Sequence, residues 1–134
     1  MAALASEWTH GDGFDASSKM GPLVSEEQRA KVVTQVDAAI SDGARLVMGG
    51  SCPDGPGWYY PATVLADVAA DQRITHEETF GPVVSLSTFD GSEEEAVRLA
   101  NDTPYGLGAN VYSGDTGRGA RVAARMQAGQ VGIN

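Results

Sequence analysis

The sequence predicts an α/β domain with a mostly parallel sheet flanked by helices. Two observations indicate this class: short apolar runs typical of buried strands alternate with longer segments of helical periodicity, and the helical segments have their own start and stop signals. A chain of 134 residues has room for one domain with a real core, so we expect residues 1–134 to form a single domain.

The first predicted helix is the best marked element. A short N-terminal helical remnant and a loop at 10–22, rich in Gly, Asp and Ser, precede it. Ser25 and Gln28 have the spacing of a capping box, and an apolar stripe then continues at helical spacing. Gly43 is the expected C-terminal cap, so the helix should cover about 25–42.

Strands and two shorter helices are expected to alternate after this first helix. Ser92 and Glu95 form a second capping box, which opens a helix at about 92–101. A last helix is expected at about 115–128, with Gly129 as its cap. Apolar runs bounded by turn residues predict the strands, at 44–50, 61–68, 82–89, 106–113 and 130–134.

Composition narrows the class of protein. Nine Lys and Arg against 18 Asp and Glu give a formal net charge of -9, which disfavours binding to nucleic acid or to an anionic membrane. Arg118, Arg121 and Arg125 fall at helical spacing, where a solvated face is commoner than an anion site. The single Cys52 permits no internal disulfide, and the N-terminus has no leader or membrane-span pattern, so we expect a cytoplasmic protein.

The stretch ITHEETFGPVV, residues 74–84, is the main candidate for chemistry. It places His76, Glu77 and Glu78 directly before a Phe-Gly-Pro turn and an apolar run. Taken alone, the pattern fits both half of an active site and an ordinary junction between loop and strand. A histidine beside carboxylates can shuttle protons, so His76 and Glu77 are candidate acid–base catalysts.

Several further stretches agree on one family. MGPLVSEEQ, GARLVMGG, YYPATVL, HEETFGPVV, NDTPYGLGANVYS and QAGQVGIN resemble, in this order and spacing, the aldehyde dehydrogenase superfamily. The resemblance covers the chain from about Gly11 to Asn134. It implies the fold of the later part, the C-terminal half, of an aldehyde dehydrogenase catalytic domain.

The resemblance also implies a role for the stretch at 74–84. Glu78 would bind the hydroxyls of the nicotinamide ribose of NAD or NADP, and Phe80 would pack beside the nicotinamide. These residue types suit the task, because a carboxylate accepts two hydrogen bonds from a vicinal diol and an aromatic face suits a planar ring.

Other parts of the family's active site have no counterpart in this sequence. The resemblance implies that a catalytic cysteine, a general-base glutamate and a Rossmann-like cofactor domain precede this segment. We therefore expect a truncated aldehyde dehydrogenase-like protein that does not oxidise aldehydes alone. Cys52 is not expected to replace the nucleophile, because no basic residue closer than Arg45 would lower the pKa of its thiol.

Two alternatives remain open. The fold could serve a cofactor-independent acid–base enzyme, an isomerase, lyase or cyclase acting on a small molecule through His76 and Glu77. It could also be a non-catalytic interaction module. For assembly we expect a homo-oligomer or a complementing chain, because Val131 and Ile133 lie on a final strand with nothing after it in the sequence to cover it. No metal site is predicted.

Overall fold

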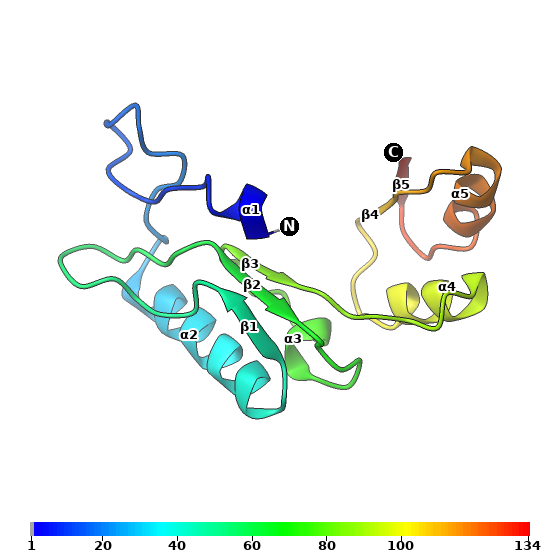
Figure 1. The fold of residues 1–134 in the computed structure, drawn as a ribbon, viewed down its shortest axis with the longest axis horizontal. Helices are drawn as coiled ribbons and strands as arrows, with labels where there is room; N and C mark the ends of the chain where they lie inside the picture. Colours follow the sequence, from blue (N-terminus) through cyan, green and yellow to red (C-terminus); the bar gives the residue numbers. More distant parts are fainter. Residues whose placement is uncertain (1) are drawn as a thin grey trace. The chain divides into compact units, whose positions relative to one another are not determined.

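The computed structural model describes residues 2–134, which fold as two compact units that divide between Thr88 and Phe89. The N-terminal unit contains a three-stranded sheet in the order β1-β2-β3, and the C-terminal unit contains a two-stranded sheet, β4-β5 (Figure 1). Helices pack beside both sheets, so the predicted α/β class is confirmed.

The three-stranded sheet is mixed. β1 (Arg45–Met48) pairs antiparallel with β2 (Thr63–Ala66), whereas β2 pairs in parallel with β3 (Val83–Ser85). The short helix α3 (Arg73–His76) lies in the connection between the two parallel strands. In the C-terminal unit β4 (Gly108–Val111) and β5 (Gln130–Ile133) are also parallel, so two of the three strand pairs are parallel, as predicted.

The core of the N-terminal unit lies where helix α2 (Glu26–Ser41) packs on the sheet (Figure 1). Val32 and Val36 of the predicted apolar stripe are fully buried, together with Leu65 of β2 and Tyr60 just before it. Because large apolar side chains from both elements meet there, this contact fixes α2 against the strands.

Both ends of α2 follow the sequence signals. The Ser25 hydroxyl accepts a hydrogen bond from the Gln28 amide at 3.1 Å. At the other end Gly43, with φ of 101°, donates to the Ile40 carbonyl at 3.0 Å, and Ala44 donates to the Ala39 carbonyl at 2.9 Å. This pair of bonds is a Schellman motif, which needs a left-handed residue at the glycine position.

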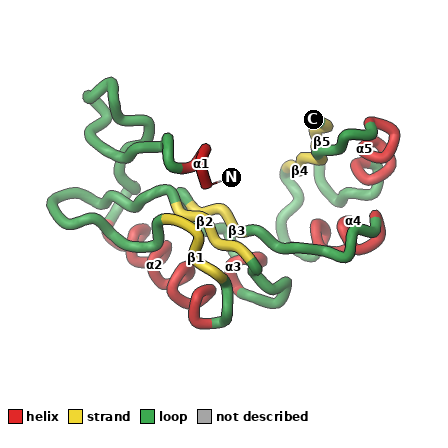
Figure 2. Tube along the Cα trace, viewed as in Figure 1, coloured by secondary structure: helices red, strands yellow, loops and turns green. Residues whose placement is uncertain are grey.

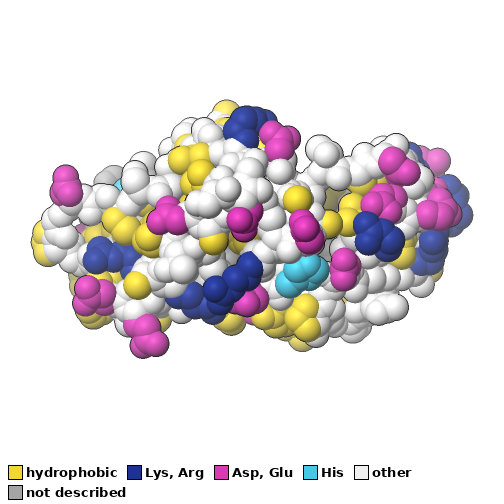
Figure 3. All heavy atoms as spheres, turned by 90° about the horizontal axis from the view of Figure 1, so that it is seen from below, with side chains coloured by type: hydrophobic (Ala, Val, Ile, Leu, Met, Phe, Trp, Pro, Cys, Tyr) yellow, Lys and Arg dark blue, Asp and Glu magenta, His cyan; other side chains and the backbone are white. Residues whose placement is uncertain are grey.

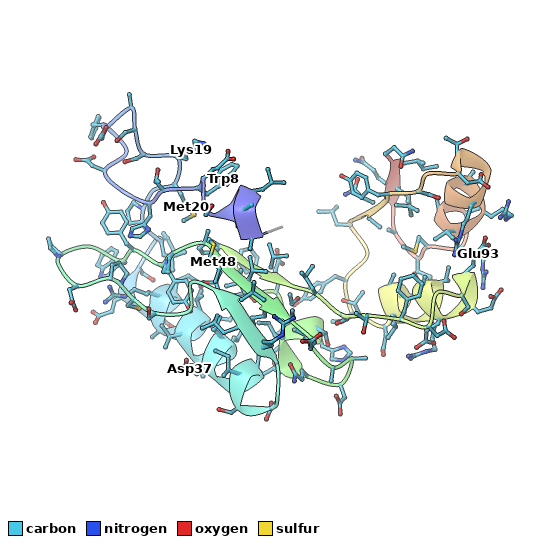
Figure 4. All side chains as sticks on the ribbon, in the orientation of Figure 1. Trp8, Lys19, Met20, Asp37, Met48 and Glu93 are labelled. Carbon is cyan, nitrogen blue, oxygen red and sulfur yellow. The ribbon has the colours of Figure 1, made fainter. Side chains whose placement is uncertain are left out.

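The segment before α2 is mostly loop (Figure 2). It begins with a short helix, α1 (Ala2–Ala5). The Thr9 carbonyl accepts hydrogen bonds from the amides of Lys19 and Met20, at 3.0 and 3.1 Å, which brings this part of the loop back beside Trp8 (Figure 4). The predicted N-terminal helical remnant and loop are therefore both present.

Two capped helices define the C-terminal unit. Ser92 caps α4 (Glu93–Asn101) by accepting from the Glu95 amide, and Asp115 caps α5 (Thr116–Ala123) by accepting from the Arg118 amide. α5 lies in the connection between the parallel strands β4 and β5, which completes a β-α-β unit.

Charged side chains link these two helices. Arg121 pairs with Glu93 at 2.9 Å, Arg118 pairs with the same carboxylate at 3.6 Å, and Arg125 pairs with Glu94 at 3.4 Å (Glu93 is labelled in Figure 4). All three guanidinium groups remain partly exposed to solvent. On the face shown in Figure 3, Lys and Arg side chains (dark blue) lie among Asp and Glu side chains (magenta).

The last helix, α5, is shorter than predicted: it ends at Ala123 instead of at about residue 128. The side chain of Asn101 holds the segment that follows: its amide nitrogen donates to the Arg125 carbonyl at 3.0 Å, and its oxygen accepts from the Gln127 amide at 2.8 Å. Gly129 does not cap the helix but donates to the Gly106 carbonyl at 2.8 Å. From Gln127 onward, bonds to residues distant in sequence thus replace the local bonds that continue through Met126.

None of the helices within residues 2–134 is long and apolar enough to cross a membrane.

Candidate functional site

The candidate site is the loop of residues 77–80, called the 77–80 loop below. It begins at Glu77, the extended C-terminal cap of α3, and leads through Gly81 into β3. Phe80 has a φ of 49°, a left-handed conformation that costs a residue with a side chain about 1–2 kcal/mol. The side chain of Phe80 is 66% exposed. An unfavourable backbone holds an exposed aromatic group here, which is typical of functional loops.

Three polar side chains of α2, Gln28, Lys31 and Gln35, contact this loop. Their spacing of three and four residues places them on one face of the helix, and we call them the polar row. The contacts follow the loop residue by residue: Gln35 Nε2 donates to Glu77 Oε2 at 3.4 Å and Lys31 Nζ to the Glu78 carbonyl at 3.3 Å.

Gln28 makes the shortest of these contacts. Its side-chain nitrogen donates to the Thr79 carbonyl at 2.8 Å and to the Phe80 carbonyl at 3.2 Å. A carboxamide nitrogen carries two hydrogens, so both are used on consecutive carbonyls. Gln28 and Lys31 therefore hold the backbone of the loop, and Gln35 contacts the side chain at its start.

Gly81 allows the loop to lie this close to α2. A Cβ atom at this position would lie 2.6 Å from Cγ2 of Val32 and 3.2 Å from its Cγ1. Non-bonded carbon atoms prefer about 3.5–4.0 Å. The glycine of the Phe-Gly-Pro turn is therefore required by packing against a fully buried valine.

His76 and Glu77, the predicted acid–base pair, have different partners. His76 Nε2 lies 2.8 Å from the Ala70 carbonyl, and since a carbonyl only accepts, this ring nitrogen carries the proton. Glu77 pairs with Arg73 at 2.7 Å. The hydrogen bond from that guanidinium holds the pKa of the Glu77 carboxyl below its usual value. Each group thus has a structural partner, and their catalytic role stays a prediction.

Glu78 and Phe80, the predicted cofactor contacts, lie two residues apart on the 77–80 loop, and both are exposed. The ammonium group of Lys31 lies 5.9 Å from the centre of the Phe80 ring, within the range of a cation–π contact. An anionic, an aromatic and a cationic residue therefore lie on or beside the 77–80 loop.

The remaining sequence candidates lie elsewhere. Cys52 is an exposed free thiol. The ring of His10 is tilted by 39° against the ring of Tyr59, with 5.9 Å between the ring centres. The pocket beside His10, lined in part by Trp8 and Met48, includes no residue of the 77–80 loop. Within residues 2–134 no group of three or more His, Cys, Asp or Glu side chains is placed to hold a metal ion.

Sequence reasoning missed the polar row. Gln28 was interpreted as part of a capping box, and its amide does contribute to the cap, but its side-chain nitrogen bonds to the loop. Lys31 and Gln35 were not singled out from the sequence, although Gln35 is only 2% exposed. The available signal was the spacing of three polar residues on one face of the helix, but the sequence does not show that the 77–80 loop lies against that face.

The whole chain, residues 1–134, matches the model of the aldehyde dehydrogenase family. It is 47% identical over 128 residues to a betaine aldehyde dehydrogenase of Bacillus subtilis, covering 92% of this chain and 26% of that protein. It is 43% identical over 133 residues to a succinate-semialdehyde dehydrogenase of Paenarthrobacter nicotinovorans, covering 99% of this chain and 29% of that protein.

Solved structures agree with these matches. The crystal structure of a betaine aldehyde dehydrogenase from Staphylococcus aureus in complex with NAD+ superposes with a TM-score of 0.90 at 39% identity, over 98% of this chain and 27% of that one. An NADP-dependent enzyme of Escherichia coli gives a TM-score of 0.92 at 37% identity. The chain thus spans between a quarter and a third of the length of these relatives.

Proposed function

Because this chain belongs to the aldehyde dehydrogenase family, we propose that its 77–80 loop holds the nicotinamide ribose of NAD or NADP in an aldehyde-oxidising enzyme. The observation that carries the proposal is an exposed carboxylate, Glu78, and an exposed aromatic ring, Phe80, on a loop whose backbone is fixed by α2. When bound, the nicotinamide would accept a hydride from the substrate.

The residues fit this ligand. The Glu78 carboxylate can accept two hydrogen bonds from the vicinal hydroxyls of a ribose, and the ring of Phe80 offers a flat apolar surface to the nicotinamide. The left-handed backbone at Phe80 sets the direction in which that ring leaves the loop. Lys31 adds a positive charge near the ring, which favours a ligand that carries phosphate.

The activity of the whole enzyme needs more than this chain supplies. We propose that both units belong to one catalytic domain, and that aldehyde oxidation requires residues from the remaining length of its relatives. The relatives are named for betaine aldehyde and succinate semialdehyde, so the proposed substrate is a small aldehyde. The proposed compartment is the cytoplasm, where the exposed thiol of Cys52 stays reduced.

For assembly we propose association with a second copy of the chain. Leu107 and Tyr112, at either end of β4, are 93% and 80% exposed, and Ile133 of β5 is 41% exposed. Burial of apolar side chains of this size against a partner is favourable. Light scattering across a dilution series should show dissociation at low concentration, and a monomer at every concentration would contradict the proposal.

Titration with nicotinamide mononucleotide, followed by NMR of the chain, tests the cofactor contact. We expect the signals of Glu78 and Phe80 to shift on binding. Glu78→Gln should weaken binding roughly tenfold, because a bond to a charged acceptor is lost. Glu94→Gln makes the same change of charge at an exposed position outside the loop and should leave the affinity unchanged.

The sign of the Glu78→Gln effect is decisive. The mononucleotide carries a net negative charge, so removal of a nearby carboxylate strengthens binding if only long-range electrostatics matters. Weaker binding therefore indicates a direct contact with the ligand. Tighter binding, or no shift at Glu78 and Phe80 in the unmodified chain, would contradict the proposed function.

A further inference from the structure

We infer that Gln28 is a positioning residue for the proposed cofactor contact: its side-chain amide sets the backbone of the loop from which Glu78 and Phe80 extend. This inference rests on the proposed function, because the positioning matters only if those two side chains contact the cofactor. Gln28 itself need not touch the ligand. It acts through the carbonyl groups of Thr79 and Phe80.

The geometry indicates positioning rather than general packing. One nitrogen atom donates to two consecutive carbonyls, at 2.8 and 3.2 Å, from a helix about fifty residues earlier in the sequence. Consecutive carbonyls of an extended strand point in opposite directions. They can meet a single donor only if the chain turns between them, and the turn here is the left-handed residue Phe80.

The same bonds stabilise an otherwise unfavourable backbone. Left-handed backbone is unfavourable for phenylalanine, so surrounding contacts must favour it over the ordinary conformations. Lys31 contributes a third bond to this stretch, to the Glu78 carbonyl. Gly81 fixes the exit of the loop by its close approach to Val32. Gln28 is the member of the polar row that bonds to Phe80 itself.

The capping interaction of Gln28 separates two possible roles. Its backbone amide donates to Ser25 and supports the start of α2, whereas its side chain contacts the loop. Ser25→Ala removes the cap and leaves the side-chain bonds to the loop. Gln28→Met keeps the backbone amide and the approximate shape of the side chain but has no donor. The two variants therefore weaken either the helix or the loop.

The test measures the backbone conformation of Phe80 and the affinity for nicotinamide mononucleotide in the same samples. The amide-to-Hα coupling and the backbone chemical shifts of Phe80 report its φ. We expect Gln28→Met to move these values away from a left-handed residue and to weaken mononucleotide binding by about fivefold. Ser25→Ala should lower thermal stability while the Phe80 signals and the affinity stay as in the unmodified chain.

Gln28→Glu gives an independent check. It retains the size of glutamine but presents only acceptors to two carbonyls, so its effect on the Phe80 signals should be at least as large as that of Gln28→Met. Unchanged Phe80 signals in both Gln28 variants would overturn the inference, as would equal changes in Ser25→Ala. If the unmodified chain fails to bind the mononucleotide, the proposed function is overturned, and the Phe80 signals alone decide whether Gln28 sets the loop.

Discussion

Replacing Gly81 by alanine should destabilise the N-terminal unit through a single contact. The added Cβ would lie 2.6 Å from Val32 Cγ2, about 1 Å closer than non-bonded carbons prefer. Val32 is fully buried in the core cluster, so the loop must move instead. Overpacking of this kind costs about 1–3 kcal/mol.

A double-mutant cycle isolates this contact. Val32→Ala removes both atoms that clash, at its own cost of about 1–3 kcal/mol for two lost methyl groups. In the double variant the clash is absent, so its measured loss of stability should be smaller than the sum of the losses in the two single variants. The expected coupling is about 1–2 kcal/mol, within the range known for residues in contact.

Urea unfolding followed by tryptophan fluorescence measures these free energies, since Trp8 and Trp58 are both in the N-terminal unit. Gly13→Ala is the matched control, because a Cβ there would meet no atom within 4 Å, and it should stay within about 0.5 kcal/mol of the unmodified chain. Strictly additive effects of Gly81→Ala and Val32→Ala would refute the packing argument.

Two further predictions concern the dependence of stability on pH. Burial raises the pKa of Tyr60 to about 12, and the hydroxyl of the neighbouring Thr63 is already engaged with Pro61 and Gly50. The unfolded chain therefore loses this proton first, so stability should fall by about 2 kcal/mol between pH 10 and 12, and Tyr60→Phe should lack that loss in urea titrations. Arg73 lowers the pKa of Glu77, so the ion pair should contribute to stability above about pH 4.5, and this contribution should be lost as the pH falls through the pKa of Glu77 in the folded chain. If Glu77→Gln loses thermal stability at acid pH just as the unmodified chain does, the prediction is contradicted.

Local signals in the sequence predicted the helices that have caps. Ser25, Ser92 and Asp115 each accept a backbone hydrogen bond three residues ahead, as the capping patterns require. Helix α3 was not predicted, because it has only four residues and Gln72 before it makes no side-chain cap bond. The early end of α5 also has no local signal, since Asn101 lies more than twenty residues before the segment that it holds.

The candidate site shows the same limit. His76 and Glu77 were predicted from their neighbouring positions in the sequence, and Glu78 and Phe80 from the family resemblance, but the contacts between the 77–80 loop and α2 were not predicted. The antiparallel pairing of β1 with β2 could not be predicted from periodicity either, because apolar runs do not indicate strand direction. Both the position of the loop and the direction of strand pairing depend on residues that are distant in the sequence.

The ion pairs between α4 and α5 make the C-terminal unit sensitive to its solvent. Exposed pairs such as Arg121 with Glu93 weaken as ionic strength rises, because the screening length falls to about 3 Å in 1 M salt. The core of the N-terminal unit contains buried apolar side chains such as Val36 and Leu65, and sulfate strengthens their burial. A rise in sulfate concentration therefore weakens the ion pairs between α4 and α5 while it strengthens the core around α2, which shifts the order in which the amides of the two units open to exchange.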